Sequence, residues 1–118
     1  MEKFSIKTPL AGEYLTTVRL TTGGLCALVG FDVDTAEDFK VCVTESLLLL
    51  KRNGYESASI EFSVGEALGC SVVGERSGGA VESGAEDEIS YALLTALLGE
   101  VKFEKDEQSR VKAIAFEG

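Results

Sequence analysis

The sequence has no histidine, and it has few basic residues for a chain of 118 residues. Without histidine, the chain lacks both the commonest general base and the commonest transition-metal ligand, which excludes catalytic triads and zinc-hydrolase sites. Lysine and arginine number 11 against 20 aspartate and glutamate residues, a formal net charge of −9. Such a chain has no uncompensated basic surface for phosphate backbones, so we expect no direct nucleic-acid partner.

Cysteine and long apolar runs are also scarce. The three cysteines, Cys26, Cys42 and Cys70, are odd in number, widely spaced and set among apolar residues. This pattern predicts reduced thiols packed as small hydrophobic side chains, and with them a cytoplasmic location. The segment MEKFSIKT carries no signal-like stretch, and Leu47–Leu50 is too short to span a bilayer. We therefore expect no targeting segment and no membrane partner.

The residues that are present have the composition of one folded domain. Hydrophobic residues make up 45% of the chain and charged residues 26%, with a single proline, Pro9. These proportions are typical of a globular protein, and the length is enough to bury one core. We predict a single domain over residues 1–118.

Hydrophobic spacing predicts eight elements in the order strand, helix, helix, strand, strand, helix, strand, strand. They are a strand from Phe4 to Pro9, a helix from Gly12 to about Val29, a helix capped by Asp34 or Thr35 that stops near Gly54, strands at Ser57–Val64 and about Leu68–Val73, a helix around Ile89–Leu98, and strands around Val101–Glu104 and Arg110–Phe116. This order predicts a two-layer α+β sandwich, with a mixed, mostly antiparallel sheet and the helices on one face.

Three segments carry more specific expectations. The core stripe of the second helix is predicted to be Phe39, Val43, Leu47 and Leu50. Residues 74–87 are rich in glycine and acids, with no hydrophobic period, which predicts a mobile loop that builds no core. The last helix is hydrophobic on nearly every side, so we expect it to be well buried.

The stretch EYLTTVRLTTGGLCALVGFDVDTAEDFKVCVTESLLLLKRNGY resembles a family pattern, EYV-x-x-x-RL…G…GF…EDLK-x-AVSEACTNA-x-x-HAY. That pattern is typical of the anti-sigma-factor serine/threonine kinases of the GHKL (Bergerat-fold) ATPase superfamily. The corresponding residues are Glu13-Tyr14, Arg19-Leu20, Gly30-Phe31, Glu37-Asp38, Lys40, Glu45 and Tyr55. The later segments SIEF and LLTALLGEVKF are also similar to the family. The resemblance implies a GHKL ATPase-like fold over nearly the whole chain, with a shortened lid.

The resemblance also implies a chemistry. Family members bind Mg-ATP, phosphorylate a serine of an antagonist protein and, in another state, hold a sigma factor. Their E-x-x-x-N box supplies a carboxylate base and an asparagine that ligates magnesium. Here Glu45 matches the base, but Leu49 replaces the asparagine and offers magnesium no oxygen. The alternative interpretation of Glu45 is a solvated or helix-paired carboxylate without chemistry.

The two other nucleotide motifs also differ from the family. The D-x-G-x-G turn that recognises adenine matches the region of Glu75, Ser77 and Gly79, where the longer acid and Arg76 would narrow a purine site. The glycine-rich start of the last helix corresponds to 86–90, where three consecutive acids would repel phosphate. The lid between these motifs, about 80–84, is short.

These observations lead to three hypotheses. The first is an anti-sigma-like regulator that binds a sigma factor or an anti-anti-sigma-like antagonist, with degenerate ATP motifs, no cofactor and no kinase activity. The second is a divergent ATP-dependent serine/threonine kinase that uses Mg-ATP with Glu45 as base. The third is a subunit that only dimerises. Arg19 is a candidate partner-binding residue, and a surface salt bridge is its alternative interpretation.

Overall fold

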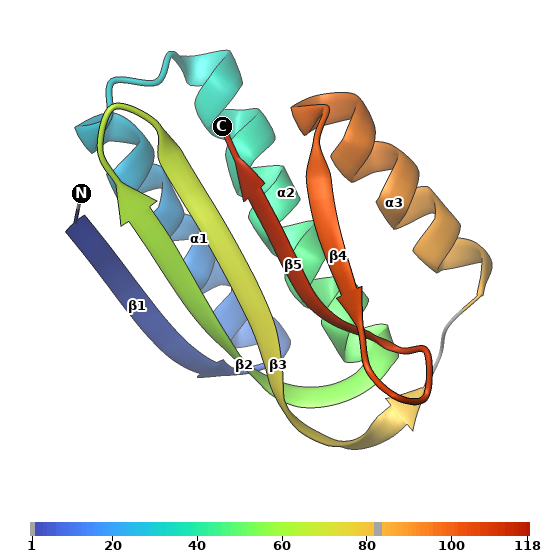
Figure 1. Ribbon diagram of the computed structural model, residues 1–118. Coiled ribbons are helices and arrows are strands. Elements are labelled where there is room, and N and C mark those ends of the chain that lie inside the picture. The colour runs from blue at the N-terminus through green and yellow to red at the C-terminus, as the bar shows by residue number, and fades with distance from the viewer. Residues whose placement is uncertain (1, 82–83) are drawn as a thin grey trace.

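The computed structural model describes residues 2–81 and 84–118, and the order of its elements is the predicted one (Figure 1). The elements are β1 (Glu2–Pro9), α1 (Gly12–Leu28), α2 (Val33–Arg52), β2 (Asn53–Val64), β3 (Leu68–Val81), α3 (Ala85–Leu98), β4 (Val101–Lys105) and β5 (Val111–Glu117). Within the described residues, no helix is both long enough and apolar enough to cross a bilayer.

The five strands form one sheet in the order β1-β2-β3-β5-β4, and the three helices cover one of its faces (Figure 1). The predicted two-layer α+β sandwich is therefore confirmed. All four strand pairings of the described residues are antiparallel, where a mixed, mostly antiparallel sheet was expected. The reason is the path after α3: β4 lies at the sheet edge, and β5 turns back between β4 and β3.

The core lies between α2 and the sheet. The four residues of the predicted stripe, Phe39, Val43, Leu47 and Leu50, are all at most 1% exposed. They share the core with inward-facing residues of β2, β3 and β5, among them Ile60, Phe62, Val72 and Ile114. Burying a large aliphatic or aromatic side chain contributes about 1.5–3 kcal/mol, so this layer supplies most of the stabilisation of the fold.

The start of α2 differs from the prediction. The N-cap is Asp32, not Asp34 or Thr35: its Oδ1 accepts a hydrogen bond from the Thr35 backbone N–H at 2.7 Å. Asp32 is the last residue with an extended backbone, so its carboxylate is the one that can reach the open amides of the first turn. The same bond lowers the pKa of Asp32.

The predicted loop over residues 74–87 is wrong for 74–81 and 85–87, while residues 82–83 of that prediction lie outside the described residues. β3 continues to Val81 and pairs with the start of β2, with register shifts between Asn53 and Ala58. Because most side chains of this extension are exposed, it has no hydrophobic period by which the sequence could reveal a strand. α3 begins at Ala85, so the three acids of 86–88 lie in its first turn, where the helix dipole favours negative charge.

The expectation that α3 is well buried is also wrong. Along its inner side, Asp87, Ser90 and Leu94 are buried, whereas Ile89 is 65% exposed. The helix packs beside α2 and the edge strand β4, at the end of the helical layer, so only one of its sides is covered.

The turn between β4 and β5 is fixed by one carboxylate. Asp106 accepts hydrogen bonds from the Tyr55 hydroxyl at 2.9 Å, from the backbone N–H of Gln108 and Arg110, and from Arg110 Nε at 3.0 Å. Burial alone would raise the pKa of Asp106, but these donors and the Arg110 charge outweigh it and lower the pKa to about 2. The turn is thereby tied to β2 through Tyr55.

This pKa predicts a pH dependence of stability. The folded-state pKa of Asp106 lies below its ordinary value of 3.8, so its contribution is present above about pH 4 and is lost as the pH falls toward 2. Urea unfolding of the native protein and of Asp106→Asn between about pH 2 and 5 measures this contribution. We expect the native protein to be more stable at pH 5 and the difference to shrink on acidification. A difference that stays constant over this range would contradict the assignment.

Candidate functional site

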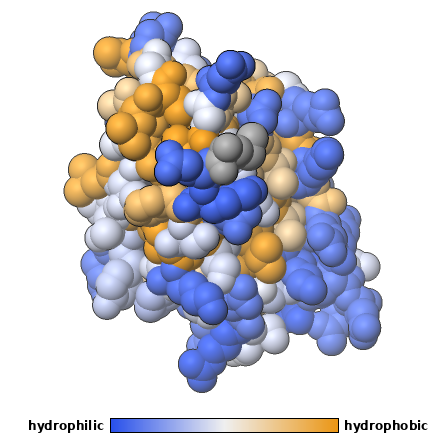
Figure 2. Space-filling view, turned by 60° about the vertical axis from the view of Figure 1, so that its left-hand side comes forward, coloured by the Kyte–Doolittle hydropathy of each residue, from blue (hydrophilic) through white to orange (hydrophobic). Residues whose placement is uncertain are grey.

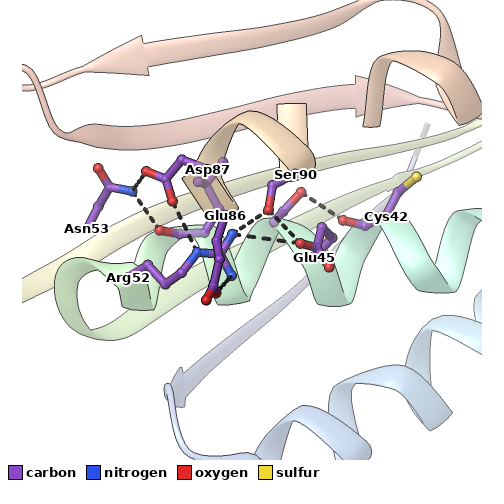
Figure 3. A network of polar contacts seen from close by, with 9 residues as sticks. Cys42, Glu45, Arg52, Asn53, Glu86, Asp87 and Ser90 are labelled. Carbon is purple, nitrogen blue, oxygen red and sulfur yellow. Dashed lines mark hydrogen bonds and ion pairs between the residues drawn. The ribbon is translucent and has the colours of Figure 1, made fainter. Parts of the chain in front are cut away.

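A network of polar side chains joins the end of α2 to the first turns of α3 (Figure 3). Arg52 is its centre: Nε donates to Asp87 Oδ1 at 3.0 Å, and Nη2 donates to Ser90 Oγ. Ser90 in turn donates to Glu45 Oε1 at 2.5 Å, and Arg52 Nη2 lies 3.7 Å from the same carboxylate oxygen. The helices are therefore linked through a chain of charged and neutral hydrogen bonds.

Asn53, the C-cap of α2, extends this network to the sheet. Its Nδ2 donates to the Leu49 carbonyl at 2.8 Å and to Asp87 Oδ2 at 3.0 Å, and its Oδ1 accepts from the Val111 N–H at 3.0 Å. Asn53 is only 3% exposed, so its amide replaces water for three buried partners. One side chain thus ties α2, α3 and β5 together.

The network is largely shielded from solvent and carries a negative charge. The side chains of Arg52 and Asp87 are 13% and 8% exposed, and that of Glu45 is 21% exposed. Glu86 lies 4.0 Å from Arg52 at the solvent side. One guanidinium therefore faces three carboxylates, and an added anion would find no unengaged cation among these residues.

The two residues of α2 that match the family's E-x-x-x-N box, Glu45 and Leu49, have different surroundings. Glu45 is part of the network, bonded to Ser90 and near Arg52. Leu49 is fully buried in the hydrophobic core. The backbone carbonyl of Leu49 accepts from Asn53, so neither its side chain nor this oxygen faces an open site. Among the described residues, no three cysteine, aspartate or glutamate side chains are placed to hold a metal ion.

The residues matched to the adenine turn lie outside the network, on the β3 extension. Glu75 and Ser77 are exposed, and Ser77 pairs with Tyr55 of β2. Gly79 faces Gly54 so closely that a Cβ built on Gly79 would lie 3.2 Å from the Gly54 carbonyl oxygen. No ion pair or side-chain hydrogen bond of the described residues joins these three positions to Glu45.

The sequence did not reveal Arg52, Asn53 and Ser90 as residues of this site. Arg52 lies in the last turn of α2, and the acids of 86–88 were expected only to repel phosphate. The only signal in the sequence was the opposite charge of Arg52 and the acids of 86–88. Arg52 and Asp87 are 35 residues apart, and no local pattern specifies a pair at that separation. The structure shows that the acid of 87 compensates the arginine.

The three cysteines are buried, as predicted, and within the described residues they are free thiols. Burial raises the pKa of the Cys42 thiol to about 12, with a smaller contribution from Asp38 and Glu45. Burial likewise raises the pKa values of Cys26 and Cys70. Because the thiolate is the reactive form, these residues are inert packing side chains.

The helix α1 exposes two large hydrophobic side chains. Leu20, the neighbour of Arg19 in the sequence, is 74% exposed, and Leu28, the last residue of the helix, is 75% exposed. Arg19 Nη2 lies 3.6 Å from Glu37 Oε2, and Glu37 also pairs with Lys40 at 2.5 Å, so Arg19 forms a half-exposed surface ion pair. Figure 2, which brings the β1 and α1 side of the molecule forward, shows several hydrophobic areas at the surface.

Comparison with known proteins gives a partial match. Over 63 residues the chain is 30% identical to the serine-protein kinase RsbW of Bacillus thuringiensis, Bacillus mycoides and Bacillus cereus. The match covers 53% of this chain and 39% of the length of these relatives. No family model matches the chain. The similarity supports the resemblance to anti-sigma-factor kinases.

Proposed function

We propose that this chain is a protein-binding regulator of the anti-sigma type that does not turn over ATP. The observation that carries the proposal is the engagement of Glu45. The family resemblance implies that this carboxylate is the catalytic base. In the structure it accepts a hydrogen bond from Ser90 and faces Arg52. A base must be free to accept a proton from its substrate, and this carboxylate is already bonded within the protein.

Mg-ATP does not fit the residues at this position. Magnesium requires near-octahedral oxygen ligands, and Leu49 presents a buried hydrocarbon where the family has an amide. Phosphate groups favour a helix start with open amides and no acids, whereas the first turn of α3 contains Glu86, Asp87 and Glu88. We infer that the fold is kept as a scaffold and that its degenerate motifs make it a pseudokinase.

The outer side of α1 is the surface that we assign to the partner. Leu20 places a large apolar side chain in solvent, and its neighbour Arg19 pairs with Glu37 of α2; Leu28 is a second exposed leucine at the end of the same helix. Arginine is one of the residues enriched among those that carry binding energy at protein interfaces, and an exposed leucine beside it offers apolar area to bury. The resemblance implies a sigma factor or an anti-anti-sigma-like antagonist as the partner. A homodimer through the same surface is the alternative.

Binding without nucleotide is the experimental test. The immobilised chain is titrated with a purified sigma factor or antagonist protein of its own organism, with and without Mg-ATP. We expect saturable binding whose Kd is the same in both conditions, and Leu20→Glu should weaken it at least about tenfold. Thr95→Glu, an exposed position on α3 with the same change in charge, is the matched control. Binding that requires Mg-ATP would contradict the proposal.

A second candidate function is a divergent serine/threonine kinase with Glu45 as base and Mg-ATP as cofactor. The partial match to serine-protein kinases favours it. In that case Arg52 and Ser90 must release Glu45 when nucleotide binds. Transfer of the γ-phosphate to the antagonist protein, abolished in Glu45→Gln, would establish this function in place of the first.

A further inference from the structure

The outward side of α3 is an apolar helix surface without a neighbour among the described residues. Ile89, Ala92 and Ala96 recur at spacings of three and four, so they lie on one side of the helix. All three are exposed, Ile89 to 65%, while the opposite side carries the buried Asp87, Ser90 and Leu94. We call the three exposed residues the α3 outer stripe.

The segment that carries the α3 outer stripe contains charged residues of one sign only. Residues 84–100 contain four acids, Glu86, Asp87, Glu88 and Glu100, and no lysine or arginine. Asp87 is bonded to Arg52 on the inner side, and Glu86 lies 4.0 Å from the same arginine but is 76% exposed. Glu88 and Glu100 are also exposed. A surface that offers apolar contact within an acidic border is complementary to an apolar surface with a basic border.

We propose that the α3 outer stripe docks an amphipathic helix of another protein, with apolar residues along its centre and lysine or arginine at its flanks. Alanine at 92 and 96 allows the backbones of two helices to approach to about 8 Å, which suits a helix better than a strand. Ile89 fills the partner's groove, and the flanking cations pair with Glu86 and Glu88. This inference goes beyond the proposed function, because the surface assigned there is α1.

The same charges exclude two other occupants. A second copy packed parallel places Glu86 and Glu88 against their own counterparts, and an antiparallel copy places them near Glu100. Either arrangement brings carboxylates together with no cation from the segment to separate them. A lipid bilayer with anionic headgroups would be repelled in the same way.

A synthetic peptide tests the proposal on the intact chain. The probe is a labelled three-heptad helix with leucine and alanine on one side and lysine at the flanks, and its control carries glutamate in place of lysine. Binding is followed by fluorescence anisotropy at about 50 mM salt, where ionic contacts are weakly screened. We expect saturable binding of the lysine peptide and none of the glutamate peptide.

Two variants locate the binding surface. Ile89→Glu should weaken binding of the lysine peptide at least about tenfold, whereas Leu20→Glu on α1, with the same charge change, should leave it within about twofold. The added carboxylate in Ile89→Glu increases attraction for lysine, so a loss reports the apolar contact. Melting temperatures check that both variants fold. Absence of binding, equal losses in both variants, or equal binding of the glutamate peptide would overturn the proposal, as would self-association that Ile89→Glu abolishes.

Discussion

Replacing Arg52 with methionine is expected to lower the free energy of unfolding by about 3–5 kcal/mol, because it removes one partner of a buried ion pair. Methionine has a similar length but no donor, so Asp87, whose side chain is 8% exposed, loses the guanidinium that neutralises it. Ser90 and Glu45 lose the same partner. Chemical denaturation followed by circular dichroism gives the change directly.

Lys51→Met is the matched control for this prediction. Lys51 is the preceding residue of α2, it is exposed, and it forms no ion pair within the described residues. Its replacement removes the same charge from the same helix end and should cost well under 1 kcal/mol. The double variant Arg52→Met, Asp87→Leu should recover part of the loss, because the more buried carboxylate is no longer left without its cation, while Glu45 keeps its bond from Ser90. If Arg52→Met is as stable as Lys51→Met, the network does not stabilise the fold.

Gly74→Ala is expected to destabilise the protein by about 2–3 kcal/mol through overpacking. A Cβ at Gly74 would lie 2.5 Å from Cγ and Cδ1 of the Tyr55 ring, well inside contact distance. The ring has little freedom to move, because its hydroxyl donates to Asp106 and the Arg110 guanidinium lies 5.7 Å from its centre. Denaturant unfolding of the variant measures the cost.

Gly24→Ala provides the comparison for Gly74→Ala. Gly24 lies within α1, and an added Cβ there would have no heavy atom of the described residues within 4 Å. Because alanine favours a helix over glycine, this variant should be more stable by about 0.5–1 kcal/mol. The same replacement of glycine by alanine should therefore lower the free energy of unfolding at position 74 and raise it at position 24. A stable Gly74→Ala would show that the contact between Tyr55 and β3 is looser than the structure has it.

The inward side of α2 could be predicted from the sequence, because burial against a sheet leaves a periodic pattern. Phe39, Val43 and Leu47 are buried as their spacing predicts. The β3 extension could not be predicted, since paired backbones in solvent need no hydrophobic period. The outer stripe of α3 misled the prediction because apolar spacing shows that a surface is apolar, not what covers it.

The candidate site was predictable only in part. Glu45 and Leu49 were found through the resemblance, because they match the family's E-x-x-x-N box, whose two residues lie four apart on one helix. Arg52, Asn53 and Ser90 are brought to Glu45 by the packing of α3 on α2. Such a tertiary contact is not encoded in any short motif. The family pattern marked the location of the site, and the structure shows its contents.

Thermal unfolding with and without millimolar Mg-ATP is the most direct test of the central claim, that this site does not take a nucleotide. A ligand that binds only the folded state at about 100 times its Kd stabilises it by about 2.7 kcal/mol, which raises the melting temperature by several degrees. We expect no shift of the melting temperature beyond that of a matched magnesium chloride control. A clear upward shift with Mg-ATP that Glu45→Gln diminishes would contradict it.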